Sequence, residues 1–444
     1  MTPIPIHHTS SEACVVDILT RAQNPAAAHV FTRLDAESAV MQAQAADRLR
    51  ISGASLGALH GLPITLKDNI DVIGQTTMSG ALVCGDEPAA AQDAPVVKRL
   101  RQAGAVLVGK TNMSEFAFSG VGINPHYGTP RNPSDTHLAR VPGGSSSGAA
   151  VSVALGLAYA ALGTDTGGSI RIPAALCGLV GFKGSQSRIP LDGVMELSRS
   201  LDTVGVIARH VRECLQVDAV LAPQQPLPMQ SADLRHLRFA VPQTLLLDDM
   251  EPQVADAFQR SLTRISAAGA QVVDIPFTSL GDIAALSMPG GFSPVEGYAA
   301  HHVRLARAPD RIDPRVMARM TLGRDVSARE YIGLLDRRRT WTAQAQDTLQ
   351  GFDAMLSPTV PMRAPELAPL LASDEAFFKV NRLLLRNPSA INYLNGCAFS
   401  LPCQAPEALP VGLMVSGVQG SDAHLACVAL AIETLLNGVQ YPGG

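Results

Sequence analysis

The sequence predicts an α/β fold, in which helices cover a sheet, and two stretches indicate this. In the first, residues 94–104 have helical spacing and stop at Gly104, and the continuous apolar run AVLVGK (105–110) follows as a strand. In the second, a strand-like run (237–242), a helix stopped by a glycine (251–269) and another strand (270–276) follow one another. Such alternation is typical of sheets with helices packed on them.

The composition suits a large buried core and argues against polyanionic partners. Of the 444 residues, 46% are hydrophobic and 17% are charged, against a usual charged share of about 25%. The formal net charge of −4 leaves no positive excess, so neither nucleic acid nor an anionic membrane is an expected partner. Length alone would suggest two or three domains.

The sequence shows no targeting, membrane or metal-binding pattern. Its start lacks a basic segment followed by an apolar one, so no secretory signal is predicted. The longest apolar run, Ala149–Leu162, is interrupted by Ser152, Gly156 and Tyr159 and falls short of the ~18 residues of a membrane span. The seven scattered cysteines have no C-x-x-C spacing, which indicates neither a zinc site nor a disulfide framework. We therefore expect a cytoplasmic protein.

Local patterns predict the remaining elements. Residues 12–50 look like an amphipathic helical segment that ends near Gly53, and residues 120–148 are loop-like. Residues 147–163 begin as a helix and change to strand near Leu157. Residues 280–345 are helical and form either a cap over an active site or a peripheral layer. Further strands are expected at 62–70, 179–183, 353–361 and 409–417.

Two short motifs mimic other protein classes. Residues 104–111 match the phosphate-loop pattern G-x-x-x-x-G-K-[ST], but the intervening AVLV favours a buried strand over a curled anion-binding loop. Residues 144–148 match the nucleophile elbow G-x-S-x-G, but the polar, proline-broken RNPSDTHLARVP before them offers no leading strand. Nucleotide binding and an α/β-hydrolase fold are therefore disfavoured.

The segment 142–173 holds two glycine–serine clusters, at 143–148 and 167–169. Glycines let backbone N–H groups approach a ligand closely, and serines among them are placed for nucleophilic or proton-relay chemistry. No Asp–His pair lies nearby, and no downstream histidine has a pattern that marks it as a base. The base must come from elsewhere, and each serine taken alone would usually be a turn former.

Four segments together resemble the amidase signature family. Residues 143–185 are similar to its namesake motif throughout, and residues 61–80 resemble its lysine segment. Residues 104–120 resemble its second strand and turn, and residues 400–433 its C-terminal strand and helix. Because the lysine segment and both serine clusters occur in the family's order, the resemblance outweighs the turn-former interpretation of the isolated serines.

The resemblance implies one α/β/α domain over residues 1–444, built around a large mixed, mostly parallel twisted sheet. Residues 1–55 would form an N-terminal helical layer and residues 56–225 the signature core. Residues 226–444 would form a second half, with the variable helical cap at about 280–345.

The resemblance also implies a Ser–cis-Ser–Lys triad. Ser169 would be the nucleophile, Ser145, preceded by a cis peptide bond, would relay the proton, and Lys67 would be the base. Lysine accepts a proton only when neutral, and burial at the end of an apolar strand would lower its pKa. A hydroxyl can relay a proton because it donates and accepts at once.

Further residues of the motif would support this triad. Backbone N–H groups at 166–169, at the start of a helix-like segment, would form an oxyanion hole. Asp165 and Arg171 flank this loop and either hold it rigid or form an ordinary salt bridge. The supporting residues are Asp165, Thr166, Gly167, Gly168, Ser146 and Arg171.

The activity implied is hydrolysis of a carboxamide, carbamate or urea-like C–N bond through a Ser169 acyl-enzyme, with no cofactor or metal. One alternative is the glutamine-amidase component of a tRNA-dependent amidotransferase, which would need partner subunits. Residues 384–403 look more like the stand-alone amidases. A non-catalytic binding protein on the same fold is the other alternative, disfavoured because all three triad residues are present.

The sequence leaves the substrate open among dicarboxylic monoamides, aryl amides, carbamates and urea-like compounds. Arginines of the variable region could hold a substrate carboxylate, although a solvated helix face is at least as consistent with their pattern. The pocket candidates are Arg304, Arg311, Arg315, Met317, Arg319 and Met320. The expected partner is a small-molecule amide, and a homodimer is the assembly to test.

Overall fold

The structure is a computed structural model of the chain that describes residues 10–288 and 290–438. The first nine residues of the predicted N-terminal layer and the last six of the predicted second half lie outside this part. Within it, the helices fall short of the combined length and apolarity that a membrane span requires.

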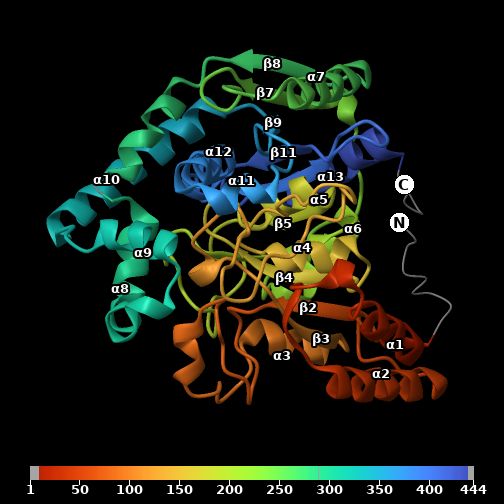
Figure 1. Ribbon diagram of the computed structural model, residues 1–444. Coiled ribbons are helices and arrows are strands. Elements are labelled where there is room, and N and C mark those ends of the chain that lie inside the picture. The colour runs from red at the N-terminus through yellow and green to blue at the C-terminus, as the bar shows by residue number, and fades with distance from the viewer. Residues whose placement is uncertain (1–9, 289, 439–444) are drawn as a thin grey trace.

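One 11-stranded sheet runs through the molecule and takes strands from both halves of the sequence (Figure 1). The strands in spatial order are β1 (Phe31–Leu34), β3 (Val106–Thr111), β2 (Pro63–Lys67), β4 (Ala160–Asp165), β6 (Thr203–Ala208), β5 (Val180–Lys183), β10 (Cys397–Pro402), β11 (Gly412–Gly417), β9 (Ala354–Pro358), β7 (Arg238–Pro242) and β8 (Gln271–Ile275). The large mixed sheet is as predicted.

The predicted excess of parallel pairing is wrong. Among the described strands, six of the ten pairings are antiparallel. Parallel pairing is confined to β3–β2–β4 and β9–β7–β8, towards the two edges. In the middle, the connection 403–411 between β10 and β11 is too short for a helical crossover, so these strands pair as a hairpin.

Helices cover both faces of the sheet. On one face, α3 (Pro95–Gln102), α6 (Val211–Leu221), α7 (Pro252–Ala267) and α13 (Asp422–Asn437) share an apolar core with the strands. The opposite face packs against α1 (Ser11–Arg21), α4 (Ser147–Ala154), α5 (Arg171–Cys177), α10 (Ala328–Thr348) and α12 (Asp374–Tyr393). Figure 1 shows α8 (Phe292–Arg307), α9 (Pro314–Met320) and α10 grouped beside the sheet.

The N-terminal segment is not the continuous helical stretch that its pattern predicts. Helix α1 ends at Arg21, and α2 (Ala36–Ile51) begins only after the short strand β1. Pro25 starts a 3₁₀ turn behind Asn24, whose side chain accepts a hydrogen bond from Ala26 N. A proline lacks the N–H that would continue α1, so the chain turns there and adds β1 to the sheet edge.

The phosphate-loop mimic is a helix-to-strand turn. Gly104 has a φ of +82° directly after α3, a conformation that favours glycine. Residues Val106–Thr111 then form the fully buried strand β3. The prediction of a strand in place of an anion-binding loop is confirmed.

Candidate active site

Strand β2 places Lys67 on the face of the sheet that α4 covers. Ile64 and Leu66 belong to the core on the other face, and side chains alternate along a strand. Thr65 therefore points towards α4, where its hydroxyl lies 3.0 Å from that of Ser152, and Lys67 follows the same direction. Because β2 and β4 are parallel, their carboxyl ends, which carry Lys67 and Asp165, lie on the same side of the sheet.

The Lys67 amine is fully buried and hydrogen-bonds only hydroxyls among the described residues. Its Nζ donates to Ser145 Oγ at 2.7 Å and to Thr164 Oγ1 at 2.8 Å. Burial lowers the pKa of Lys67 to about 7, against the opposing charges of Asp202 and Asp165. A large share of this amine is therefore neutral near pH 7, the state that can accept a proton.

Backbone hydrogen bonds hold Ser145 in place. The Gly144–Ser145 peptide bond is cis. Gly144 N donates to Gly120 O at 2.8 Å, and Ser145 O accepts from Ser114 N at 3.1 Å. The first glycine–serine cluster is thereby fixed to the segment after β3.

Ser146 joins the two glycine–serine clusters. Its N–H donates to Ser169 O at 3.3 Å, and its hydroxyl donates to Thr164 O at 3.3 Å. The Ser169 side chain lines a cavity, and its hydroxyl makes no hydrogen bond to another described residue. The link from Lys67 to Ser145 is thus formed, whereas no hydrogen bond joins the hydroxyls of Ser145 and Ser169.

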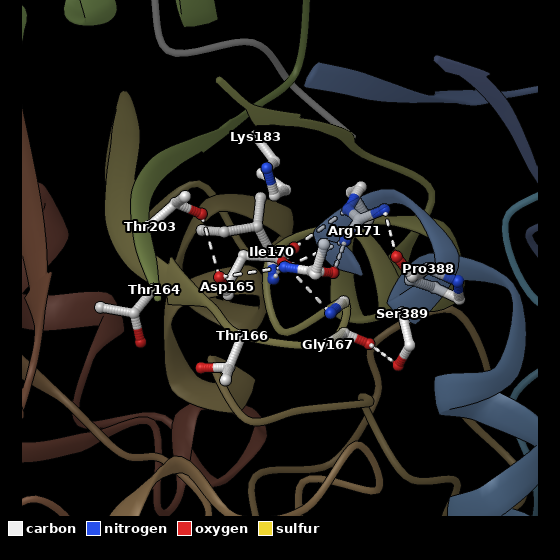
Figure 2. Close-up of polar contacts among 12 residues, drawn as sticks. Thr164, Asp165, Thr166, Gly167, Ile170, Arg171, Lys183, Thr203, Pro388 and Ser389 are labelled. Carbon is white, nitrogen blue, oxygen red and sulfur yellow. Dashed lines mark hydrogen bonds and ion pairs between the residues drawn. The ribbon is translucent and has the colours of Figure 1, made fainter. Parts of the chain in front are cut away.

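A buried ion pair organises the turn that carries Ser169 (Figure 2). Arg171 donates through Nε to Asp165 Oδ2 at 3.0 Å and through Nη2 to Asp165 Oδ1 at 2.9 Å, with neither side chain exposed. Burial alone would raise the pKa of Asp165, but the guanidinium of Arg171 outweighs it and holds that pKa well below its ordinary value. Arg171 also reaches α12, donating to Asn392 Oδ1 at 2.6 Å and Pro388 O at 3.0 Å.

The Asp165 carboxylate accepts a hydrogen bond from one of the N–H groups that were expected to form the oxyanion hole. Gly168 N donates to Asp165 Oδ1 at 2.9 Å and Ile170 N to Asp165 Oδ2 at 3.2 Å. The N–H groups of Gly167 and Ser169 make no hydrogen bond to a described residue, and both residues line the cavity. The donors available for an oxyanion are therefore these two, with Gly168 as a turn residue.

The turn requires glycine at position 168. Its φ is +121°, and a Cβ there would lie 2.5 Å from Pro388 Cβ and 2.8 Å from Ile172 Cδ1. We expect Gly168→Ala to displace Ser169 and to lower turnover roughly 10²-fold, because misplacement by about 1 Å costs that much. Initial rates on an amide substrate measure this. Gly74→Ala is the control, since Gly74 has a φ of +76° but nothing within 4 Å of its Cβ position; equal losses would contradict the prediction.

The cavity in front of Ser169 has a volume of about 670 Å³, within the usual range of small-molecule sites. Its walls come from residues 117–119, the 3₁₀ segment η5 (Thr278–Ser287), the start of α8, α9 and α12. The helical stretch predicted at 280–345 thus contributes residues to this cavity.

Of the six pocket candidates in that stretch, only Arg319 lines the cavity. Met320 is fully buried, and Met317 packs against the same apolar cluster. The other three arginines form ion pairs elsewhere, Arg304 with Glu87, Arg311 with Asp86 and Arg315 with Asp374. Their sequence pattern could not reveal these partners, which lie far away in the chain.

Several residues that surround the predicted triad were not among the residues predicted from the sequence. Thr164 accepts from Lys67, and Asn69 Nδ2 also donates to it at 3.1 Å. Asp202 accepts from Thr166 Oγ1 at 2.5 Å, and burial raises the pKa of Asp202 to about 6. Thr164 lies within the motif at 143–185 and could have been predicted from the sequence, whereas Asp202 carries no local signal.

Comparison with known proteins identifies the family. The amidase family model matches residues 13–426. The chain is 38% identical to 2-amino-5-chloromuconic acid deaminase of Comamonas testosteroni, over 92% of this chain and 88% of the relative. It is 33% identical to the A component of the glutamyl-tRNA(Gln) amidotransferase of Moorella thermoacetica, over 96% of this chain and 93% of the relative. A crystal structure of an amidase matches with a TM-score of 0.87 and 33% identity, covering 98% of both chains. The chain belongs to the amidase signature family.

Proposed function

We propose that this chain hydrolyses the C–N bond of a small carboxamide, carbamate or urea-like compound. The observation that carries the proposal is the 2.7 Å hydrogen bond from the buried Lys67 amine to the Ser145 hydroxyl, beside the cavity-lining Ser169. A serine hydroxyl is a weak nucleophile until a neighbouring base takes its proton, and Lys67 is the group whose lowered pKa suits that task. We place the enzyme in the cytoplasm, without cofactor or metal.

In this mechanism the Ser169 hydroxyl turns about its χ1 bond towards Ser145 and attacks the carbonyl carbon. Its proton passes to Ser145, whose own proton passes to neutral Lys67. The oxyanion accepts hydrogen bonds from the backbone N–H groups of Gly167 and Ser169. As the C–N bond breaks, the proton returns from Lys67 through Ser145 to the departing nitrogen. Water then attacks the acyl-enzyme by the same relay and regenerates Ser169.

The experiment that tests this proposal is labelling with a fluorophosphonate combined with ammonia release from a panel of amides. Wild type is expected to be labelled at Ser169 and to release ammonia, because the nucleophile is activated. Ser169→Ala is expected to lose both. Labelling of Ser169→Ala at the wild-type rate, or a wild type that neither reacts nor hydrolyses, would overturn the proposal.

The relatives favour two branches of the same chemistry. The relative named as a deaminase supports cleavage of a C–N bond in a small acid. It has the higher identity, 38% against 33% for the amidotransferase component. The second candidate function is that amidotransferase component, because the match covers 96% of this chain. Ammonia release from glutamine only in the presence of co-purifying partner proteins would favour the second.

A further inference from the structure

The charged residues that line the cavity in front of Ser169 are all positively charged. Its charged lining residues are Arg319, Arg382 and Arg386, and no described Asp, Glu, Lys or His lines it. The whole chain carries a formal net charge of −4. Positive charge is therefore concentrated at this cavity although the net charge of the chain is negative. Such an arrangement attracts anions.

Arg319 on α9 is the arginine best placed to bind one. Its guanidinium carbon lies 4.0 Å from the centroid of the Phe118 ring, and Nη1 donates to Phe118 O. It forms no ion pair and no other hydrogen bond with a described residue. Burial lowers the pKa of Arg319 to about 10, so it stays charged at neutral pH. Arg319 lines the cavity, and no described carboxylate lines it beside this guanidinium.

Asn381 on α12 adds a second donor at the same wall. Its Oδ1 accepts from Gly120 N at 2.8 Å and from Ser119 Oγ at 3.3 Å. The amide oxygen is therefore engaged, and the NH₂ group makes no hydrogen bond to a described residue. Arg319 and Asn381 thus hold the same three residues, 118–120, whose outer Cα atoms are at most about 7 Å apart.

This tripeptide is connected to the proposed relay. Gly120 O accepts from Gly144 N at 2.8 Å, and Gly144 directly precedes Ser145. Ser114 Oγ also donates to Ser119 O at 3.1 Å, and Ser114 N donates to Ser145 O. The two donors are therefore held at a fixed place relative to the reacting serines.

We propose that Arg319, with Asn381, binds a carboxylate of the substrate, so that the enzyme acts on amides that carry a second, acidic end. A guanidinium matches a carboxylate through two parallel N–H donors, and half-buried Arg319 forms no ion pair with a described residue that would compete for it. This inference rests on the proposed amide hydrolysis and specifies its substrate class.

The other lining residues complete that description. The Arg386 guanidinium donates to Asn387 Oδ1 and Asp248 O, at 2.9 and 2.7 Å. Arg382 also lines the cavity but is exposed to solvent. The remaining wall is largely apolar and includes Leu201, Ile283, Phe292, Leu322, Phe378 and Leu385. The body between the amide and the carboxylate is therefore expected to be hydrophobic.

The test compares adipic monoamide with hexanamide, which have the same chain length but differ in the carboxylate. Wild type is expected to have the higher kcat/KM for adipic monoamide. Arg319→Gln is expected to lower the ratio of the two kcat/KM values by roughly 10- to 100-fold, mainly through KM, because a charge-assisted hydrogen bond is lost. Adipate, which has no amide, should slow fluorophosphonate labelling of wild type and much less that of Arg319→Gln.

Arg315→Gln is the matched control. Arg315 lies on the same helix, stacks on Phe377 at 4.4 Å and pairs with Asp374 at 2.7 Å, but it does not line the cavity. Its variant should keep the wild-type ratio. Arg319→Lys, which keeps the charge, should retain part of the preference if Arg319→Gln fails to fold.

Three results would overturn the inference: a wild type without preference for the carboxylate, an equal fall for both amides in Arg319→Gln, or unchanged protection by adipate in that variant. Failure of the proposed function looks different, since wild type would then release no ammonia from any amide and Ser169 would not be labelled.

Discussion

Replacing Lys67 with alanine is expected to lower kcat for amide hydrolysis by roughly 10²- to 10⁴-fold, the usual contribution of a general base. Lys67 Nζ lies 2.7 Å from Ser145 Oγ, and among the described groups no other amine contacts that hydroxyl. Without it the Ser169 proton has no acceptor. Steady-state kinetics and the rate of fluorophosphonate labelling measure the loss, and both should fall together. Full activity in Lys67→Ala would eliminate Lys67 as the base.

The assignment of Lys67 as the base also predicts the direction in which activity changes with pH. With a pKa of about 7 for Lys67, the neutral fraction is about a half at pH 7 and about a tenth at pH 6. Because only the neutral amine accepts a proton, kcat/KM of wild type should fall as the pH decreases through about 7. The residual activity of Lys67→Met should lack this acid limb.

Lys183 provides the matched control for burial alone. It too is a fully buried lysine whose pKa is lowered, to about 8, by burial and the charge of Arg171. Its Nζ donates to the carbonyl oxygens of Gly184 and Gly396, at 2.8 and 2.6 Å, and not to a serine. Lys183→Met should therefore keep the acid limb near pH 7. Loss of that limb in Lys183→Met and not in Lys67→Met would contradict the assignment.

The family resemblance of residues 61–80 and 143–185 singled out the candidate triad, whereas local pattern alone marked its serines as turn formers. Lys67 ends an apolar strand, and Ser145 and Ser169 lie in glycine-rich turns on either side of α4 and β4. Alternation along β2 and the parallel pairing of β2 with β4 then bring the strand ends together. The alternation acts over a few residues and leaves a visible signature in the sequence, whereas the pairing joins Ile64 to the distant Ala160.

Contacts across the chain left no such signature. Asp202 lies 36 positions from Thr166, and Asn392 lies 221 positions from Arg171, so only the folded sheet brings them to the site. Strand β1 was missed for the same reason, because its four residues are stabilised by pairing with β3. The hydrogen bonds that Asp165 accepts from the turn could have been predicted from the sequence, because an aspartate often accepts from N–H groups a few residues after it.

Removing Arg171 is expected to destabilise the protein by about 3–5 kcal/mol, the usual cost of leaving one partner of a buried ion pair alone. Arg171→Leu would leave the Asp165 carboxylate, which has no exposed surface, without the cation that lowers its pKa most. The urea midpoint of unfolding, followed by circular dichroism, measures the change. Arg235→Leu is the control, because Arg235 pairs with Asp233 at 2.5 Å on an exposed surface, and its midpoint should not move.

A double variant separates the two roles open to this pair. Replacing both partners of a buried ion pair by apolar residues is often close to neutral for stability, so Asp165→Leu with Arg171→Met should regain much of the urea midpoint. It should not regain the fluorophosphonate labelling rate, because Gly168 N and Ile170 N lose the Asp165 oxygens that now accept from them. The protein would then be folded, but the turn that carries Ser169 would no longer be held in place by hydrogen bonds to Asp165. Recovery of both midpoint and labelling would make the pair an ordinary salt bridge; recovery of the midpoint alone would establish that Asp165 positions the nucleophile's turn.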